Sequence, residues 1–103
     1  MMWYVYVAFF FAGVFLANGI PHFVHGISGK RFQSPFASPP GCGESSPIIN
    51  IIWGLVNFII GYVLLYSFGD FTSGFSLDIL FFTLGIIITS VALAFHFGRV
   101  NKD

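Results

Sequence analysis

The chain has 103 residues, of which 56% are hydrophobic, 20% are aromatic and only 8% are charged. A soluble domain of this length needs a polar surface and takes about a quarter of its residues from the charged types, so a monomeric soluble globule is excluded. The four Lys and Arg residues balance the four Asp and Glu residues, which leaves no basic surface for nucleic acid, and the single cysteine excludes an intramolecular disulfide.

The first apolar stretch runs from about residue 3 to residue 20 and contains no charged side chain. About 20 helical residues cross the hydrocarbon layer of a bilayer, and a helix pairs its backbone polar groups within its own segment. A cleaved signal peptide begins with a basic region, whereas Met1, Met2 and Trp3 carry no side-chain charge. We therefore predict a retained membrane-spanning helix.

The segment from about residue 21 to residue 47 is predicted to be an irregular loop. All five prolines lie in it or at its edges: Pro21, Pro35, Pro39, Pro40 and Pro47. Regular helix is therefore not expected across most of the segment. Three phenylalanines among its polar residues are expected to hold the loop at the lipid headgroups: Phe23, Phe32 and Phe36. Lys30 and Arg31 are expected to contact lipid phosphates there.

Two further apolar stretches run from about residue 48 to 68 and from about residue 77 to 97. The second of these carries only Asp78, near its start. Ser76 is expected to cap the N-terminus of this helix, with Asp78 in the first turn; the alternative role for Asp78 is an outward-facing proton or cation ligand. The sequence thus predicts an all-α fold, a transmembrane bundle of three helices in a single integral membrane domain.

The distribution of cations predicts the orientation of this bundle. Lys30 and Arg31 follow the first span, and Arg99 and Lys102 follow the third, so three crossings place all four on one side. Lys and Arg are enriched on the cytoplasmic side, which puts the N-terminus outside and the C-terminus in the cytoplasm. Five aromatic residues are then expected at the outer interface: Trp3, Tyr4, Tyr6, Tyr62 and Tyr66. We predict a multi-pass protein of the cell membrane that contacts the lipid bilayer and binds no nucleic acid.

Small and polar residues recur in the second and third spans at helical spacing. They are Asn50, Gly54, Asn57 and Gly61 in the second span, and Gly85, Thr89 and Ala92 in the third. Small residues on one helix face let two backbones approach, and Asn or Thr can hydrogen-bond across the contact. We interpret these positions as helix-packing surfaces, within one subunit or between subunits. The alternative is a polar path past Asn57 and Thr89 in a small transporter or channel.

Histidines are predicted to gather on the cytoplasmic side, two at the end of the first span and one at the end of the third. With nearby loop residues they form a candidate ligand set: His22, His25, His96, Cys42 and Glu44. Imidazole, thiolate and carboxylate can bind zinc or iron, and paired imidazoles can ligate haem. Histidines resting at the membrane interface, or a proton-linked group, are the alternatives. The sequence alone specifies no cofactor.

Three short motifs stand out: ANGIPHFVHG at residues 17–26, SPF at 34–36 and HFGR at 96–99. They resemble a group of small bacterial multi-pass membrane proteins. The resemblance implies a bacterial cytoplasmic membrane, implies no activity and carries over no catalytic residue.

The function expected from the sequence is that of a small non-catalytic integral membrane protein. It would act as a homo-oligomer or as an accessory subunit of a larger membrane complex. A metal- or haem-binding membrane protein and a small transporter or channel are the alternatives. An enzyme is not favoured, because no acid–base or nucleophile pair is visible at matched depth in the membrane.

Overall fold

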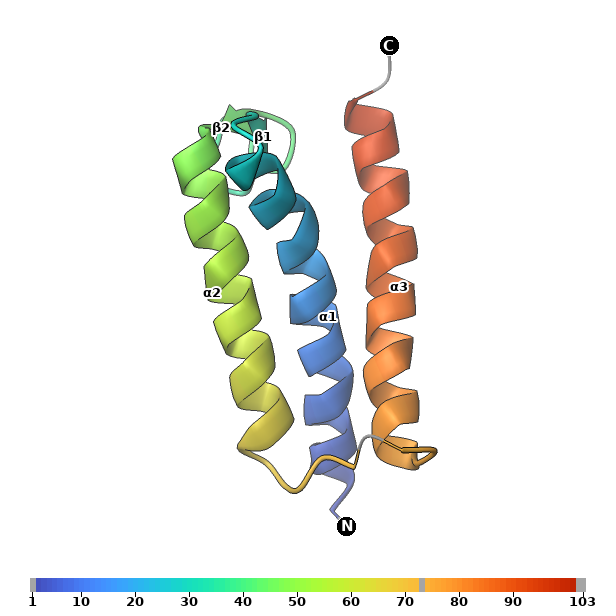
Figure 1. Ribbon diagram of the computed structural model, residues 1–103. Coiled ribbons are helices and arrows are strands. Elements are labelled where there is room, and N and C mark those ends of the chain that lie inside the picture. Colours follow the sequence, from blue (N-terminus) through green and yellow to red (C-terminus); the bar gives the residue numbers. More distant parts are fainter. Residues whose placement is uncertain (1, 73, 102–103) are drawn as a thin grey trace.

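The computed structural model describes residues 2–72 and 74–101. Three long helices lie side by side, and a small hairpin covers one end of them (Figure 1). The helices are α1 (Trp3–Ile27), α2 (Pro47–Tyr66) and α3 (Leu77–Val100), and the hairpin pairs β1 (Phe32–Gln33) with β2 (Glu44–Ser45) in antiparallel register. The main elements are helical, so the all-α fold predicted from the sequence is confirmed. All three helices are long and apolar enough to cross a membrane.

The first helix is longer than predicted. It continues through Pro21 and ends at Ile27, so the irregular segment begins at residue 28 and not at about residue 21. The last turns of α1 bury His22 and Gly26. A Cβ atom placed on Gly26 would lie 2.7 Å from the Pro47 carbonyl oxygen, which shows how closely this end of α1 approaches α2. Packing between helices therefore outweighs the local preference of Pro21 to interrupt the helix.

The second and third helices each begin at a serine cap. The Ser46 hydroxyl accepts a hydrogen bond from the Ile49 N–H at 3.3 Å, and the Ser76 hydroxyl accepts one from the Ile79 N–H at 3.3 Å. The expected cap at Ser76 is thus present. Asp78 is buried, and its Oδ2 accepts a hydrogen bond from the backbone N–H of Thr72 at 2.9 Å. Its carboxyl group therefore fixes the connection between α2 and α3.

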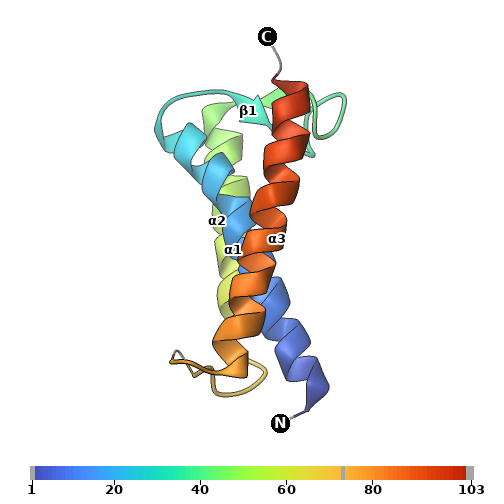
Figure 2. The same ribbon diagram turned by 90° about the vertical axis from the view of Figure 1, so that its right-hand side faces the viewer.

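The central position belongs to α1, which lies between α2 and α3 (Figure 1). In the view of Figure 2, α1 and α3 cross each other at an angle. The apolar core sits toward the N-terminal end of α1, where Val5, Phe9 and Ala12 pack with Leu65 of α2. Phe71, Phe81 and Phe82 complete this core from the α2–α3 connection and α3. The other end of the molecule has a more polar interior.

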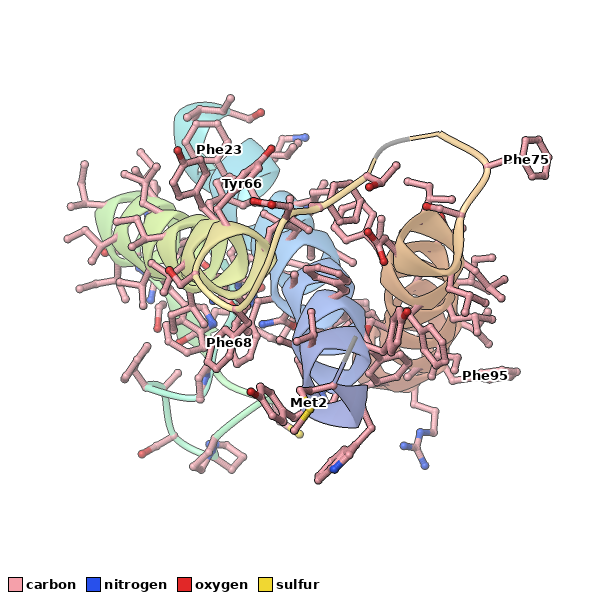
Figure 3. The ribbon with its side chains drawn as sticks, turned by 90° about the horizontal axis from the view of Figure 1, so that it is seen from below. Met2, Phe23, Tyr66, Phe68, Phe75 and Phe95 are labelled. Carbon is pink, nitrogen blue, oxygen red and sulfur yellow. The ribbon has the colours of Figure 1, made fainter. Side chains whose placement is uncertain are left out.

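Side-chain polarity is distributed in the opposite sense to that of a soluble protein. Large apolar side chains cover the outside, and Figure 3 shows Phe75 and Phe95 pointing away from the three helices. Among the residues that the structure describes, seven polar or charged ones are buried: His22, Gln33, Ser34, Ser45, Asn50, Asn57 and Asp78. Soluble monomers rarely expose a continuous apolar surface of this kind.

The two ends of the molecule differ in charge. Residue 2 and the α2–α3 connection, which contains Asp70, lie at one end (Figure 1). The segment between α1 and α2, with Lys30 and Arg31, lies at the other end together with Arg99 near the end of α3. Lys102, the fourth cation of the predicted orientation, lies outside the described residues. We call the end that holds the hairpin the loop end.

Candidate functional site

The predicted packing residues of α2 face α1 of the same chain. Asn50, Gly54, Asn57 and Gly61 are all buried. A Cβ atom on Gly54 would lie 3.0 Å from the Gly19 carbonyl oxygen. Gly54 and its neighbours on this face of α2 therefore bring α2 close to α1 of the same subunit, as small residues do in membrane helix pairs.

The packing residues predicted on α3 behave differently from one another. Gly85 is buried, and a Cβ atom there would overlap the Phe10 carbonyl oxygen of α1. Thr89 is half-buried, whereas Ala92 is exposed. Within one chain, Gly85 thus packs against α1, whereas Ala92 lies outside the contact between α1 and α3.

Asn57 is engaged in helix pairing. Its Oδ1 accepts a hydrogen bond from Asn18 Nδ2 of α1 at 3.0 Å, and its Nδ2 donates to the Trp53 carbonyl at 2.8 Å. The side chain is fully buried, so both halves of its amide are used inside the protein. These bonds account for an amide deep in an apolar helix without a transport path.

Asn50 connects α2, α1 and the hairpin at the loop end. Its Nδ2 lies within hydrogen-bond distance of three carbonyl oxygens, those of Phe32 at 3.1 Å, Ser45 at 3.2 Å and Ser46 at 3.1 Å. Since carbonyls only accept, these partners fix which end of the amide is Nδ2. Asn50 Oδ1 must then be the acceptor for His22 Nδ1, which lies 2.9 Å away. The proton of the neutral His22 ring is therefore on Nδ1.

The segment between α1 and α2 is folded against the helices. Gln33 Nε2 donates to Asn101 Oδ1 at 2.7 Å, and Asn101 Nδ2 donates back to Gln33 Oε1 at 3.2 Å. The hydroxyl groups of Ser34 and Ser45 hydrogen-bond to each other across the hairpin. This segment thus links the ends of α1 and α2 to the end of α3.

The expected contact of three phenylalanines with lipid headgroups needs correction. Phe32 is buried, because its ring is stacked on the His25 ring, with ring centres 4.0 Å apart, and lies against Phe97. Phe23 is half-buried against Phe58 of α2. Phe36 alone of the three is exposed. The hairpin needs an apolar side chain to fill the space between α1 and α3, and Phe32 supplies it.

Lys30 and Arg31 are both exposed at the loop end. Arg31 Nη2 donates to the Glu44 carbonyl oxygen at 3.3 Å, which orients its guanidinium along the surface of the hairpin. Contact of these two cations with lipid phosphates stays a prediction.

The three histidines lie at the loop end but do not meet. His25 Nδ1 donates to the Pro21 carbonyl at 2.7 Å, and His96 Nε2 donates to the Gly41 carbonyl at 2.7 Å. The Phe32 and Phe97 rings, 4.6 Å apart between centres, lie among the imidazoles. Within residues 2–72 and 74–101, no three His, Cys, Asp or Glu side chains gather as metal ligands. Cys42 and Glu44 are exposed, so the structure does not assemble the predicted ligand set.

A cavity of about 200 Å³ lies where the three helices meet the loop. Its lining residues come from all three helices and from the segment between α1 and α2: Asn18, His22, Gln33, Ser34, Pro35, Gly41, Trp53, Leu93, His96 and Phe97. Trp53 Nε1 is buried and has no hydrogen-bond partner among the residues that the structure describes. This cavity is the candidate functional site.

Sequence reasoning found His22 and His96 of this cavity but not its other polar residues. Gln33 and Ser34 come from the loop, and only the folded hairpin brings them against α3. The role of Asn18 could have been predicted from sequence, because an amide inside an apolar span needs a partner and Asn57 in the next span is such a partner. The position of Trp53 in the cavity could not, since a tryptophan in an apolar helix is equally suited to lipid contact.

Comparison of the chain with protein-family models, with curated proteins and with solved structures gave no significant match.

Proposed function

We propose that the chain is an integral membrane protein that crosses a bacterial cytoplasmic membrane three times. The inverted polarity supports this proposal, because apolar side chains on all three helices face outward while amides and an imidazole are buried. In hydrocarbon such a surface is solvated by lipid, and the buried polar groups find partners inside the protein. The short resemblance to small bacterial multi-pass proteins agrees with it.

The proposed orientation has the N-terminus outside and the loop end in the cytoplasm. Lys30, Arg31 and Arg99 lie at the loop end, whereas Asp70 lies in the connection at the other end. The positive-inside rule favours the cationic end as the cytoplasmic one.

Within the membrane, the chain is proposed to act as a non-catalytic, self-associating subunit that uses α3 for the contact. The observation that carries this proposal is an exposed row of small residues on α3. Ser90, Ala94 and Gly98 recur every fourth position and are all exposed. Of the α3 residues, all of which the structure describes, only Asp78 and Gly85 are buried within the chain. A helix with one packed face and a small-xxx-small row on another is suited to a second helix contact.

A matched pair of alanine variants tests this contact. Ala94→Leu places a bulky side chain in the small-residue row. Ala92→Leu makes the same change at an exposed residue turned by about 200° around the helix. Cys42, the single cysteine, is exposed and accepts donor or acceptor dyes, so energy transfer between copies reports association in liposomes.

We expect Ala94→Leu to require about tenfold more protein per lipid for half-maximal energy transfer. This change corresponds to a loss of about 1.4 kcal/mol in the free energy of association. Ala92→Leu should match the unsubstituted protein. Energy transfer that is equal in both variants, or absent from the unsubstituted protein, would contradict self-association through α3. The second of these results would favour an accessory subunit that needs a different partner.

A further inference from the structure

We propose that the cavity at the loop end binds a small primary ammonium ion, which donates a hydrogen bond to Nε2 of His22. This inference concerns a site inside one chain, so it does not depend on the proposed orientation or on self-association. It rests on unpaired acceptor atoms in the cavity walls, on donor atoms that are already in use, and on the apolar and aromatic remainder of the lining.

The principal acceptor is Nε2 of His22, whose side chain is only 3% exposed and lines the cavity. Its Nδ1 donates to Asn50 Oδ1, so the neutral ring carries a lone pair on Nε2. Among residues 2–72 and 74–101, the bond to Asn50 is the only hydrogen bond of this ring. In the same part of the chain, Trp53 Nε1 is the one enclosed side-chain polar atom without a partner. The unpaired Nε2 of His22 is therefore not enclosed and opens on the cavity.

Asn18 supplies a second acceptor on the same face of α1. Its Nδ2 donates to Asn57 Oδ1, and the Trp53 carbonyl fixes which end of the Asn57 amide is the acceptor. Asn18 Oδ1 thus has no partner among the described residues, and it is not enclosed either. Asn18 and His22 are four positions apart, a spacing that leaves about 5–6 Å between Cβ atoms on a helix. The two acceptors therefore belong to neighbouring side chains of one cavity wall.

His96 supplies a third acceptor. Its Nε2 donates to the Gly41 carbonyl, so the neutral ring carries a lone pair on Nδ1, which has no partner among the described residues. The donor atoms of the lining side chains are in use, apart from the enclosed Trp53 Nε1. The donor atoms with partners are Asn18 Nδ2, His22 Nδ1, Gln33 Nε2, Ser34 Oγ and His96 Nε2.

Walls that offer acceptors are matched by a group that has only donors. A primary ammonium carries three N–H donors and no lone pair, whereas a hydroxyl or an amide brings acceptor atoms that need donors. None of the lining residues is Lys or Arg, and the Trp53 and Phe97 rings in the walls attract a cation. The N–H groups that do not bond His22 have the other acceptors of the walls, or water that reaches them, as partners.

The size of the cavity limits the body of the ligand. The volume is about 200 Å³, and an apolar cavity of about 150 Å³ in another protein holds benzene. Pro35, Leu93 and Phe97 supply apolar wall. A chain of about four carbons behind the ammonium group therefore fits, and n-butylammonium is the probe that we choose.

Nuclear magnetic resonance of nitrogen-15-labelled histidine rings tests the proposal at His22 itself. At about pH 8.5, an ordinary imidazole is neutral while a primary amine is still protonated. The signals of the other two histidines are identified by their absence from His25→Phe and His96→Gln. Titration with n-butylammonium chloride in detergent is expected to move the Nε2 signal of His22 upfield to saturation, because its lone pair gains a hydrogen bond. The Nδ1 signal should stay in place, since the bond to Asn50 is kept.

Two further ligands separate the hydrogen bond from charge and from partition into detergent. Butyltrimethylammonium has the same charge and chain but no N–H donor, so it should leave the Nε2 signal unmoved. Butan-1-ol has the chain and one donor but no charge and two unmatched lone pairs. We expect it to bind His22 at least about tenfold more weakly than n-butylammonium does.

A pair of leucine variants tests whether the ligand lies in the cavity. Leu93→Trp places a bulky ring in the cavity wall, and Leu84→Trp makes the same change at an exposed residue of the same helix outside the cavity. We expect Leu93→Trp to bind n-butylammonium at least about tenfold more weakly, because its ring occupies the space of the ligand. Leu84→Trp should match the unsubstituted protein.

A His22 Nε2 signal that does not move with n-butylammonium would overturn the proposal. An equal movement with butyltrimethylammonium would overturn it as well, because no N–H donor would then be needed. Equal affinities for butan-1-ol and n-butylammonium would contradict recognition of a cation. Equal titrations of Leu93→Trp and Leu84→Trp, with both variants shown to be folded by circular dichroism, would place the ligand outside the cavity.

Discussion

Asn50 connects three parts of the molecule through one amide group. It joins the N-terminal turn of α2 to both strands of the hairpin and to His22 of α1. The side chain is fully buried, so water cannot replace any of these partners. The same amide also sets the tautomer of His22, and the position of the hairpin and the chemistry of the cavity wall therefore depend on one residue.

Replacement of Asn50 by leucine, a residue of similar size, should destabilise the loop end. We expect the free energy of unfolding to fall by about 2–4 kcal/mol, because His22 and the carbonyls around the amide lose a buried partner together. Unfolding by sodium dodecyl sulfate, followed by circular dichroism, measures this change. Asn101→Leu is the control, since Asn101 is exposed and bonds only the Gln33 amide among the described side chains. A loss for Asn50→Leu no larger than that for Asn101→Leu would contradict this role.

At the scale of the helices, close backbone approach determines which pairs form. Gly19 of α1 faces Gly54 of α2, and Gly13 of α1 lies against the Phe82 carbonyl of α3. Between helices in hydrocarbon, tight packing of this kind replaces the hydrophobic driving force that operates in water. The two faces of α1 therefore carry separate glycine contacts, one for each neighbour.

Gly85 and Gly98 offer a comparison within one helix. A Cβ atom at Gly85 would overlap the Phe10 carbonyl, so Gly85→Ala must move α1 and α3 apart. We expect this to lower the free energy of unfolding by about 1–3 kcal/mol. A Cβ atom at Gly98 meets open space, so Gly98→Ala should be neutral or stabilise by up to about 1 kcal/mol through helix propensity. Thermal unfolding of both variants in the same detergent measures the difference. Equal melting temperatures would rule out the close α1–α3 contact.

At the scale of the whole molecule, apolar packing and polar contacts are separated along the long axis. The apolar core lies toward the N-terminal end of α1, and the cavity and the amide contacts lie toward the loop end. In the proposed orientation the cavity is near the cytoplasmic interface, where its polar walls are closer to water than they would be at mid-bilayer.

Chemical labelling of cysteine tests the proposed orientation in cells. Cys42 is exposed in the loop, so a membrane-impermeant maleimide should label it only after the cells are permeabilised. The reference is the double variant Cys42→Ser with Gly74→Cys, because Gly74 is exposed in the α2–α3 connection and has free space for a side chain. This variant should be labelled in intact cells. The reverse pattern would invert the proposed orientation.

Some of these features follow from sequence because they depend on local pattern. The three helices follow from apolar length, the Ser76 cap from residue type, and the burial of Gly54 and Gly61 from helical spacing. The membrane location and the orientation derived from the same patterns stay predictions.

Other features depend on contacts between residues far apart in the chain. The extension of α1 past Pro21 depends on its packing against the start of α2. The burial of Phe32 and the separation of the histidines depend on Phe97, which comes from the far end of the chain. The Gln33–Asn101 pair joins residues 68 positions apart. Local pattern carries no information about such partners.

The central position of α1 also has a consequence for biogenesis in the proposed membrane setting. Because α1 precedes both of its neighbours in the chain, each later helix enters the bilayer beside a surface that is already in place. Until α2 arrives, however, Asn18 and His22 lack the partners that Asn57 and Asn50 provide. Ribosomes add roughly 5–20 residues per second, so translation of the loop and α2 takes on the order of a few seconds. During those seconds, in the proposed membrane setting, the side chains of Asn18 and His22 would lie in the bilayer without the hydrogen-bond partners of the folded chain.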